Sequence, residues 1–393
     1  MKLYNTLTSS KDEFKPLNDK KVTIYVCGIT PYDTTHLGHA FTYISFDALI
    51  RYLKFKGYKV TYTQNVTDIN DKDKDILERA KKLNVAWDKL AEHWTKHFLG
   101  DMKKLNWLFP DYYLKASEQI LTMIQLIQRL LDNDLAYQVN NSVYLDISKD
   151  KDYGKLSKYT DYKKVKFAKK FEEDLKNPDK RNPLDITLWR GSAPNQPPHI
   201  PAFKSPFGPG RPGWHSECSA MSISTLGEQI DIHGGGKDLM FPHHEAEIAQ
   251  SEGATGKVPF VKYWLHTGTV FYQGKKMSKS EGNLVMVSDL LKKYSPNAIR
   301  WLLLFKHWAK SWEYKEEDLK KAQENVNLVT SIIARSPEQG RRTTRQYNTI
   351  IKQFTKILDN NFYTPKALEF LLRLAKDNSF AELKLLYNML GFI

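Results

Sequence analysis

The pattern of hydrophobic and polar positions predicts an α/β unit near the start of the chain. Val22–Val26 is β-branched and aromatic, which is typical of a buried strand. From about Thr35 to Lys56 apolar residues recur at helical spacing, and Gly57 ends the pattern. A second strand is predicted at Tyr58–Thr63. Strand, helix and strand within about 40 residues indicate a βαβ unit, and therefore a Rossmann-type, doubly wound parallel sheet.

Downstream the pattern predicts an insertion, a return to α/β order and a helical tail. An amphipathic helix is expected at Glu118–Asp134, followed by a strand-rich, Lys-heavy stretch at Val139–Trp189. After a Pro- and Gly-rich segment, strands are predicted at Gln229–Ile232 and Thr267–Tyr272, with a helix near Pro242–Glu252 between them. We therefore expect an α/β fold with an inserted connective domain and a C-terminal helical bundle.

Composition narrows the class of protein. The 393 residues include 59 Lys and Arg against 45 Asp and Glu, so the net charge is +14, which favours RNA or phosphorylated substrates. A general Lys-rich bias would give the same surplus. No apolar run approaches the roughly 18 residues of a membrane span, and Met1–Phe14 lacks the apolar core of a signal peptide. We expect a cytoplasmic protein, in which Cys27 and Cys218 form no disulfide.

The first candidate site lies where the predicted first strand passes into its helix. Residues 35–39 read T-H-L-G-H. The unpaired N–H groups of a helix N-terminus suit phosphate binding, and Gly38 would let an adenine ring approach the backbone. His36 and His39 could donate hydrogen bonds to phosphate oxygens in a transition state. Alone, such a segment is more often an ordinary helix start with two surface histidines.

The second candidate site is a basic loop. Residues 276–283 read K-M-S-K-S-E-G-N, and Lys276 and Lys279 could close over a triphosphate. Most such loops are merely solvated. Taken together and in this order, however, the two segments are the signatures of class I aminoacyl-tRNA synthetases, and the chain resembles that class. The resemblance implies an ATP-dependent ligase with His36, His39, Lys276 and Lys279 as its catalytic residues.

A third set of residues points to a metal. Residues 211–222 read R-P-G-W-H-S-E-C-S-A-M-S, and residues 233–247 read H-G-G-G-K-D-L-M-F-P-H-H-E-A-E. His243 and Glu247 stand four residues apart, which places them on one face of a helix. With Cys27 and Cys218 they form one plausible ligand set for Zn²⁺, although a buried histidine and a surface glutamate would be the ordinary interpretation. These segments resemble the cysteinyl-tRNA synthetase family.

That resemblance implies a reaction and a site. In the family, zinc lies in the amino-acid pocket and the substrate thiolate completes its coordination, so sulfur is distinguished from a hydroxyl. One zinc ion per chain and Mg²⁺ with ATP are implied. The implied contacts to cysteine are Thr30, Thr67 and Trp214. The implied contacts to ATP or the adenylate are Gly28, Thr30, Gly38, Thr67, Gly236, Asp238 and Lys279.

The resemblance also implies a division of the chain. We expect residues 1–125 and 206–275 to form the two halves of the catalytic domain, with the zinc site in the second half. The remaining parts are a connective domain at 126–205, the basic loop and a stem-contact region at 276–325, and a shortened helical bundle at 326–393 without a full anticodon-binding domain. The expected partners are ATP, L-cysteine and cysteine tRNA, with no membrane, and the protein is expected to be a monomer.

Two alternatives remain open at the level of sequence. Residues 27–33, residues 205–210 and Phe41 look more like the mycothiol-pathway ligase that joins cysteine to glucosaminyl-inositol. Glu247, residues 219–222 and the +14 charge favour the tRNA enzyme instead. An inactive RNA-binding paralogue should show damage in one of the motifs, and none is seen. We therefore predict a cysteine–tRNA ligase.

Overall fold

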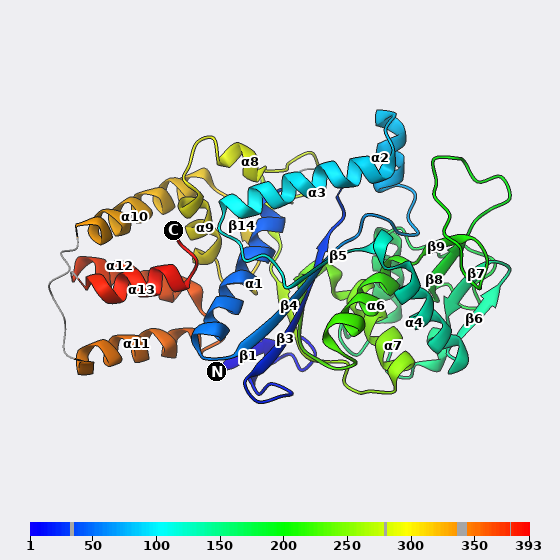
Figure 1. Cartoon of the computed structure of the whole chain (residues 1–393), viewed down its shortest axis with the longest axis horizontal. Helices are drawn as coiled ribbons and strands as arrows, with labels where there is room; N and C mark the ends of the chain where they lie inside the picture. Colours follow the sequence, from blue (N-terminus) through cyan, green and yellow to red (C-terminus); the bar gives the residue numbers. More distant parts are fainter. Residues whose placement is uncertain (32–34, 279–280, 336–343, 378) are drawn as a thin grey trace.

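The computed structural model describes residues 1–31, 35–278, 281–335, 344–377 and 379–393, without the side chains of 344–346. Its centre is a parallel sheet of strand order β11-β10-β3-β4-β5 (Figure 1). The strands are β3 (Lys21–Ile29), β4 (Lys59–Val66), β5 (Tyr112–Lys115), β10 (Ile230–Gly236) and β11 (Val261–Thr267). All four pairings are parallel, so the predicted Rossmann-type sheet is confirmed.

Helices cover both faces of this sheet (Figure 1). On one face lies α1 (Leu37–Phe55), which ends before Gly57, a residue with φ +89°. On the other face lie α4 (Ile120–Asp132), α6 (Trp214–Leu226) and α7 (His243–Thr255). The predicted helices near 35–56, 118–134 and 242–252 are therefore confirmed within a few residues at their ends.

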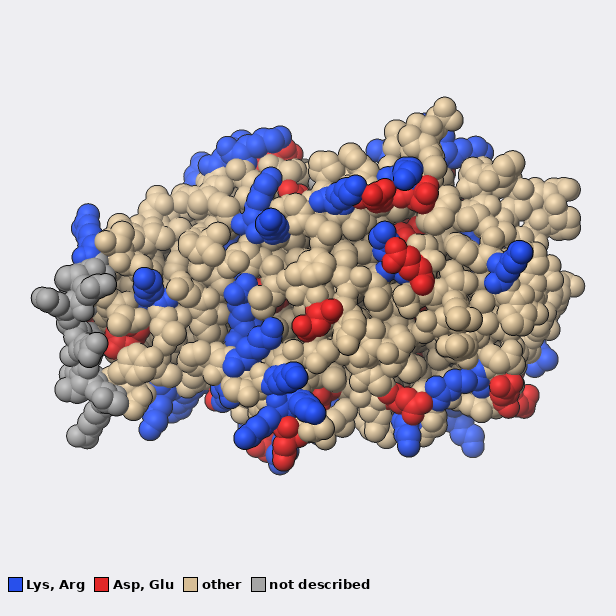
Figure 2. All heavy atoms as spheres, viewed as in Figure 1, with Lys and Arg blue, Asp and Glu red and all other residues tan. Residues whose placement is uncertain are grey.

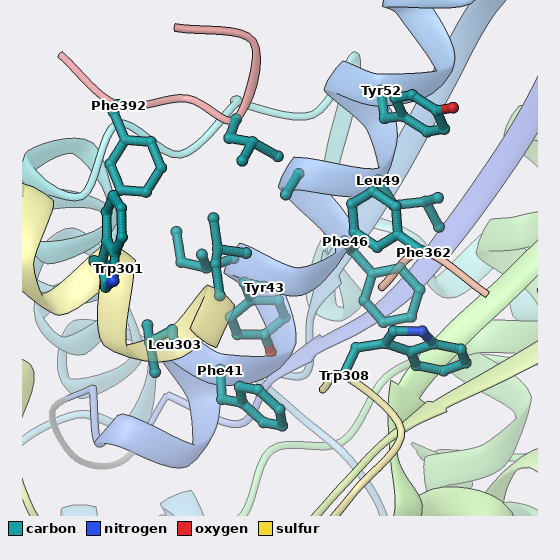
Figure 3. Close-up of a cluster of buried hydrophobic side chains, with 14 of the residues drawn as sticks. Phe41, Tyr43, Phe46, Leu49, Tyr52, Trp301, Leu303, Trp308, Phe362 and Phe392 are labelled. Carbon is teal, nitrogen blue, oxygen red and sulfur yellow. The ribbon is translucent and has the colours of Figure 1, made fainter. Parts of the chain in front are cut away.

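Alternation along β3 separates two hydrophobic cores. Val22, Ile24 and Val26 point to the core that contains α1 and the C-terminal helices, part of which is drawn in Figure 3. Tyr25 and Cys27 point to the opposite core, which also contains α6 and α7. The period of two therefore places Cys27 on the same side of the sheet as Cys218, His243 and Glu247.

The expectation of one strand at Thr267–Tyr272 was wrong. β11 ends at Thr267, and Val270–Tyr272 forms β12 in a different sheet, beside β13 (Lys275–Lys276) and β14 (Trp312–Glu313). The chain changes sheets at Gly268, where a Cβ atom would lie 2.1 Å from the backbone carbon of Lys310. Only glycine permits this close crossing of two backbones.

The stretch 139–189 is less rich in strands than expected. An antiparallel sheet is formed by β6 (Ala136–Val139), β7 (Ser142–Leu145), β8 (Ile186–Gly191) and β9 (Gly210–Pro212). Between β7 and β8, however, the Lys-rich run folds into helix α5 (Asp161–Lys170), of which only Ala168 is buried. Such a polar run lacks the alternating apolar face that a strand needs.

The remaining elements complete the two ends of the molecule. At the N-terminus β1 and β2 form a hairpin, and α2 and α3 follow β4. The predicted helical tail is present from α8 onward, interrupted by β14. These elements are β1 (Lys2–Asn5), β2 (Ser10–Glu13), α2 (Ile76–Leu83), α3 (Trp87–Lys104), α8 (Val287–Leu290), α9 (Pro296–Phe305), α10 (Glu316–Ala334), α11 (Thr344–Leu358), α12 (Thr364–Lys376) and α13 (Phe380–Met389). Within the described ranges, no helix has the length and apolar character needed to cross a bilayer.

A buried arginine joins the C-terminal helices to α1. Arg300 of α9, which is 0% exposed, forms an ion pair with Asp47 of α1. Its Nε donates to the Leu390 carbonyl at 2.8 Å, and its Nη1 donates to the Leu105 carbonyl at 3.0 Å. Nearby, Trp301 packs on Phe392 (Figure 3). The segment after α13 therefore packs against α9 and is joined through Arg300 to α1.

Candidate active site

A cavity of about 310 Å³ lies at the carboxyl ends of β3, β4 and β10. This is where ligands bind in open parallel sheets. The cavity brings together most of the predicted site residues. They are Cys27, Gly28, Thr30, His36, Gly38, His39, Thr67, Trp214, Cys218, Gly236, Asp238, His243 and Lys276. Glu247 lies behind the cavity wall, and Lys279 lies outside the described residues.

At one end of the cavity the four predicted metal ligands converge. Cys27 at the end of β3, Cys218 on α6, and His243 and Glu247 on α7 are all buried, and their donor atoms lie within 4.8 Å of one another. The two Sγ atoms are 3.9 Å apart and both cysteines are free. Glu247 Oε1 is 3.6 Å from Cys27 Sγ and 3.2 Å from His243 Nε2. The four residues offer the donor set of a zinc site.

A second combination of donors overlaps the first. Cys27 and Glu247 also lie within 4.8 Å of His233 Nε2 and His244 Nε2. Of the two sets, only the one with Cys218 and His243 supplies three residues that line the cavity. An ion held by that set would be accessible to a small ligand.

The electrostatics of the cluster fit a cation. Burial raises the pKa of the Cys27 thiol well above its usual value, and the neighbouring Cys218 and Glu247 raise it further. Glu247 Oε2 is also buried without a hydrogen-bond partner. The nearest basic groups are the imidazoles of His233, 3.4 Å from Glu247 Oε2, and His243, 3.2 Å from Oε1. A divalent ion would stabilise such a group of donors and ionise the thiols on binding.

The other end of the cavity contains the signature histidines. His36 is the N-cap of α1, and its Nδ1 accepts hydrogen bonds from the N–H groups of Gly38 at 3.1 Å and His39 at 3.4 Å. The expectation that these N–H groups are unpaired was therefore wrong, because the His36 side chain folds back onto its own helix. Because Nδ1 accepts, Nε2 of a neutral His36 carries the hydrogen and is a donor.

Gly38 and His39 hold this arrangement in place. A Cβ atom at Gly38 would lie 2.9 Å from the His36 ring, so a larger residue would displace the capping side chain. The rings of His36 and His39 stack with centroids 3.7 Å apart. The two imidazoles therefore form one unit at the start of α1.

Acid should destabilise the protein through His39. Burial lowers its pKa to about 4; the carboxylate of Asp238 opposes this shift in part, and the charge of Lys276 adds to it. A histidine in the unfolded chain titrates near 6.5, so between these pH values the unfolded state binds more protons. Stability should therefore decrease as the pH falls from about 6.5 to about 4, by up to about 3 kcal/mol. Urea unfolding of wild type and His39→Asn at pH 7.0 and 4.5 measures this, and an equal acid loss in both proteins would contradict it.

Lys276 enters the cavity from β13. Its Nζ is 2.6 Å from Asp238 Oδ2, which joins the basic loop to the turn after β10. Gly236 leaves room for this carboxylate, because a Cβ atom there would lie 2.6 Å from Asp238 Oδ1 and would displace it. Gly236 and Asp238, the predicted nucleotide contacts of this turn, therefore lie beside the Lys276 ammonium group, which could move onto a phosphate.

Asn65 was missed by the sequence analysis. Its Oδ1 accepts from the Gly28 N–H at 2.8 Å, and its Nδ2 donates to Thr67 Oγ1 at 3.1 Å. A Cβ atom at Gly28 would lie only 1.5 Å from the Asn65 carbonyl oxygen, so β3 and β4 approach closely here. No spacing in the sequence signals this link, because it depends on the register of two strands.

Trp214, the predicted contact to the amino acid, is half-buried at the start of α6. Its ring stacks on His243 with centroids 4.6 Å apart and an interplanar angle of 25°. The side chain therefore borders both the metal cluster and the cavity.

Comparison with known proteins agrees with this geometry. The family described as tRNA synthetases class I (C) catalytic domain matches residues 13–324. Among solved structures, Mycobacterium tuberculosis methionyl-tRNA synthetase in complex with methionyl-adenylate superimposes with a TM-score of 0.67, over 91% of this chain and 82% of that one, at 16% identity. Likeness at this identity shows the fold, which is that of class I synthetases.

Curated relatives narrow the family. A cysteine–tRNA ligase of Thermodesulfovibrio yellowstonii is 43% identical over 98% of this chain and 80% of its own length. One from Dehalococcoides mccartyi is 44% identical over 96% of this chain and 80% of its own length. One from Legionella pneumophila is 43% identical over 100% of this chain and 85% of its own length. The chain belongs to the cysteine–tRNA ligase family.

Proposed function

We propose that this protein activates L-cysteine with ATP and transfers it to the 3′ end of cysteine tRNA. The observation that carries the proposal is the buried Cys27, Cys218, His243 and Glu247 cluster at one end of a cavity whose other end holds the signature histidines and Lys276. One cavity thus offers a thiol-selective end and a phosphate-binding end. The family's curated relatives support the same reaction.

In this proposal the four cluster residues hold one zinc ion per chain. When bound, zinc supplies a thiophilic centre that prefers a cysteine sulfur to a serine hydroxyl. Trp214 closes the wall beside it, and Thr30 and Thr67 orient the amino acid. A carboxylate oxygen of cysteine then attacks the α-phosphorus of ATP, and the bond to pyrophosphate breaks.

Hydrogen-bond donors and cations of the chain stabilise that step. His36 Nε2–H and His39 donate to oxygens on which negative charge develops, and Lys276 and Lys279 neutralise the departing pyrophosphate, with Mg²⁺ accompanying ATP. No protein nucleophile is required. The ribose hydroxyl of the tRNA next attacks the carbonyl carbon of the adenylate, and AMP leaves.

The surface charge supports a tRNA acceptor. The net charge is +14, and basic side chains predominate on the face drawn in Figure 2. Neutralising phosphates releases counterions, which favours binding of a polyanion but would contribute little for a small sugar.

We propose that the protein acts as a cytoplasmic monomer.

Acceptor-dependent transfer tests the proposal. Purified protein is given ATP, Mg²⁺ and labelled cysteine, and then either a cysteine tRNA transcript or glucosaminyl-inositol. We expect label on the tRNA alone. Label on the amino sugar alone would assign the acceptor of the mycothiol-pathway ligase, and absence of ATP–pyrophosphate exchange with zinc bound would indicate an inactive paralogue.

A further inference from the structure

We propose that Glu173, in the inserted segment after α5, is a positioning residue for the zinc ligand His243 and acts on it through His215. This inference rests on the proposed zinc site. It extends that site beyond its ligands to a residue of the inserted region.

The three side chains form a continuous chain of hydrogen bonds. His215 Nδ1 is 2.9 Å from His243 Nδ1, and His215 Nε2 is 3.2 Å from Glu173 Oε1. Both histidines are buried, and the Glu173 side chain is 9% exposed. Water therefore has little access to compete for these bonds.

The carboxylate sets the direction of the hydrogen bonds. An ionised carboxylate only accepts, so His215 Nε2 carries a hydrogen and donates it to Glu173. In a neutral His215, Nδ1 is then the acceptor, and His243 must donate from Nδ1–H. This leaves the lone pair on His243 Nε2, the atom that lies 3.2 Å from Glu247 Oε1 within the metal cluster. The chain thus selects the tautomer of His243 that can bind zinc.

Lys72 keeps the carboxylate ionised. Its Nζ lies 2.7 Å from Glu173 Oε1. Burial alone would raise the pKa of Glu173, but the charge of Lys72 and the hydrogen bond from His215 hold it well below its usual value. The ion pair with Lys72 thus fixes the carboxylate that orients the His215 ring.

Packing restricts the ring of His243 from another side. Trp214 stacks on it at 4.6 Å, while His215 contacts its Nδ1 edge. Tautomer and orientation are thus set before an ion binds. Preorganisation of this kind raises metal affinity without adding a ligand.

The test is zinc affinity, measured by competition with a chromophoric chelator. The main variant is Glu173→Leu combined with Lys72→Met, which removes the acceptor without leaving a buried ammonium group unpaired. We expect its zinc dissociation constant to rise about 10- to 100-fold. Glu173→Gln keeps an acceptor oxygen and should stay within about threefold of wild type. The absorption bands of the Co²⁺-substituted double variant should also shift.

The chain offers a matched control. Glu252 of α7 pairs with Lys155 of the inserted segment at 2.5 Å, so Glu252→Gln weakens a similar contact that does not reach His243. We expect wild-type zinc affinity in this variant. A folded double variant with wild-type zinc affinity and Co²⁺ spectrum would overturn the positioning role, and so would equal losses in the double variant and the control. If wild type itself binds no zinc, the proposed function fails at its metal site, which is a distinct result.

Discussion

Cys218→Ser should abolish zinc binding and, with it, the activation of cysteine. The substitution removes one of two thiolates from a buried four-residue cluster, and a serine hydroxyl is a poor ligand for Zn²⁺. We expect zinc to fall to well below one ion per chain by atomic absorption. Cysteine-dependent ATP–pyrophosphate exchange should fall by about 10³-fold or more, since in the proposed function the metal binds the thiol of the substrate.

Ser222→Ala is the control for this substitution. Ser222 is buried on the same helix, and its hydroxyl bonds only to the Ser219 carbonyl among the described residues, at 3.0 Å. It should retain zinc and activity. Unchanged zinc stoichiometry in Cys218→Ser would remove Cys218 from the ligand set and leave the alternative set with His233 and His244.

Lys276→Ala should impair adenylate formation while leaving the zinc content unchanged. Lys276 lines the cavity, and in the proposed function it lies at the phosphate-binding end, away from the proposed metal ligands. Loss of one electrostatic stabiliser of a transition state typically costs about 10²- to 10³-fold in rate. Pyrophosphate exchange with saturating cysteine measures the effect, and we expect the same from Lys279→Ala.

The adjacent Lys275 provides a control of equal charge. It is exposed, pairs with Glu281 at 2.7 Å and does not line the cavity. Lys275→Ala should stay within about twofold of wild type, because exposed ion pairs contribute little. Equal losses in the two variants would mean that only the general charge of this region matters.

Features encoded locally were predictable from sequence. The strand that carries Cys27 near its end and the helix that begins after His36 follow from short-range patterns. His243 and Glu247 share a face because of helical periodicity. The convergence of Cys27 with Cys218 needed the resemblance to a family, since 191 positions separate them.

Features that depend on tertiary contacts were not predictable. The His36 cap requires one side-chain rotamer, and the change of sheet at Gly268 requires the backbone of Lys310 to pass beside it. Glu173 lies in a run whose charges look like those of any solvated surface. Only its burial against His215 distinguishes it.

The ion pair between Asp47 and Arg300 has a consequence for biosynthesis. Asp47 lies in the helix that begins at the signature histidines, yet the carbonyl that accepts from Arg300 Nε belongs to Leu390. On the ribosome, α1 emerges long before either Arg300 or Leu390 is synthesised. Until then the only cation that pairs with Asp47 among the described residues is Arg51, four residues later in the same helix, at 3.1 Å, and the buried contacts that join α1 to α9 are missing. The cavity beside the start of α1 should therefore reach its final form late, and a nascent chain that ends before α9 should lack the protease resistance of the finished protein.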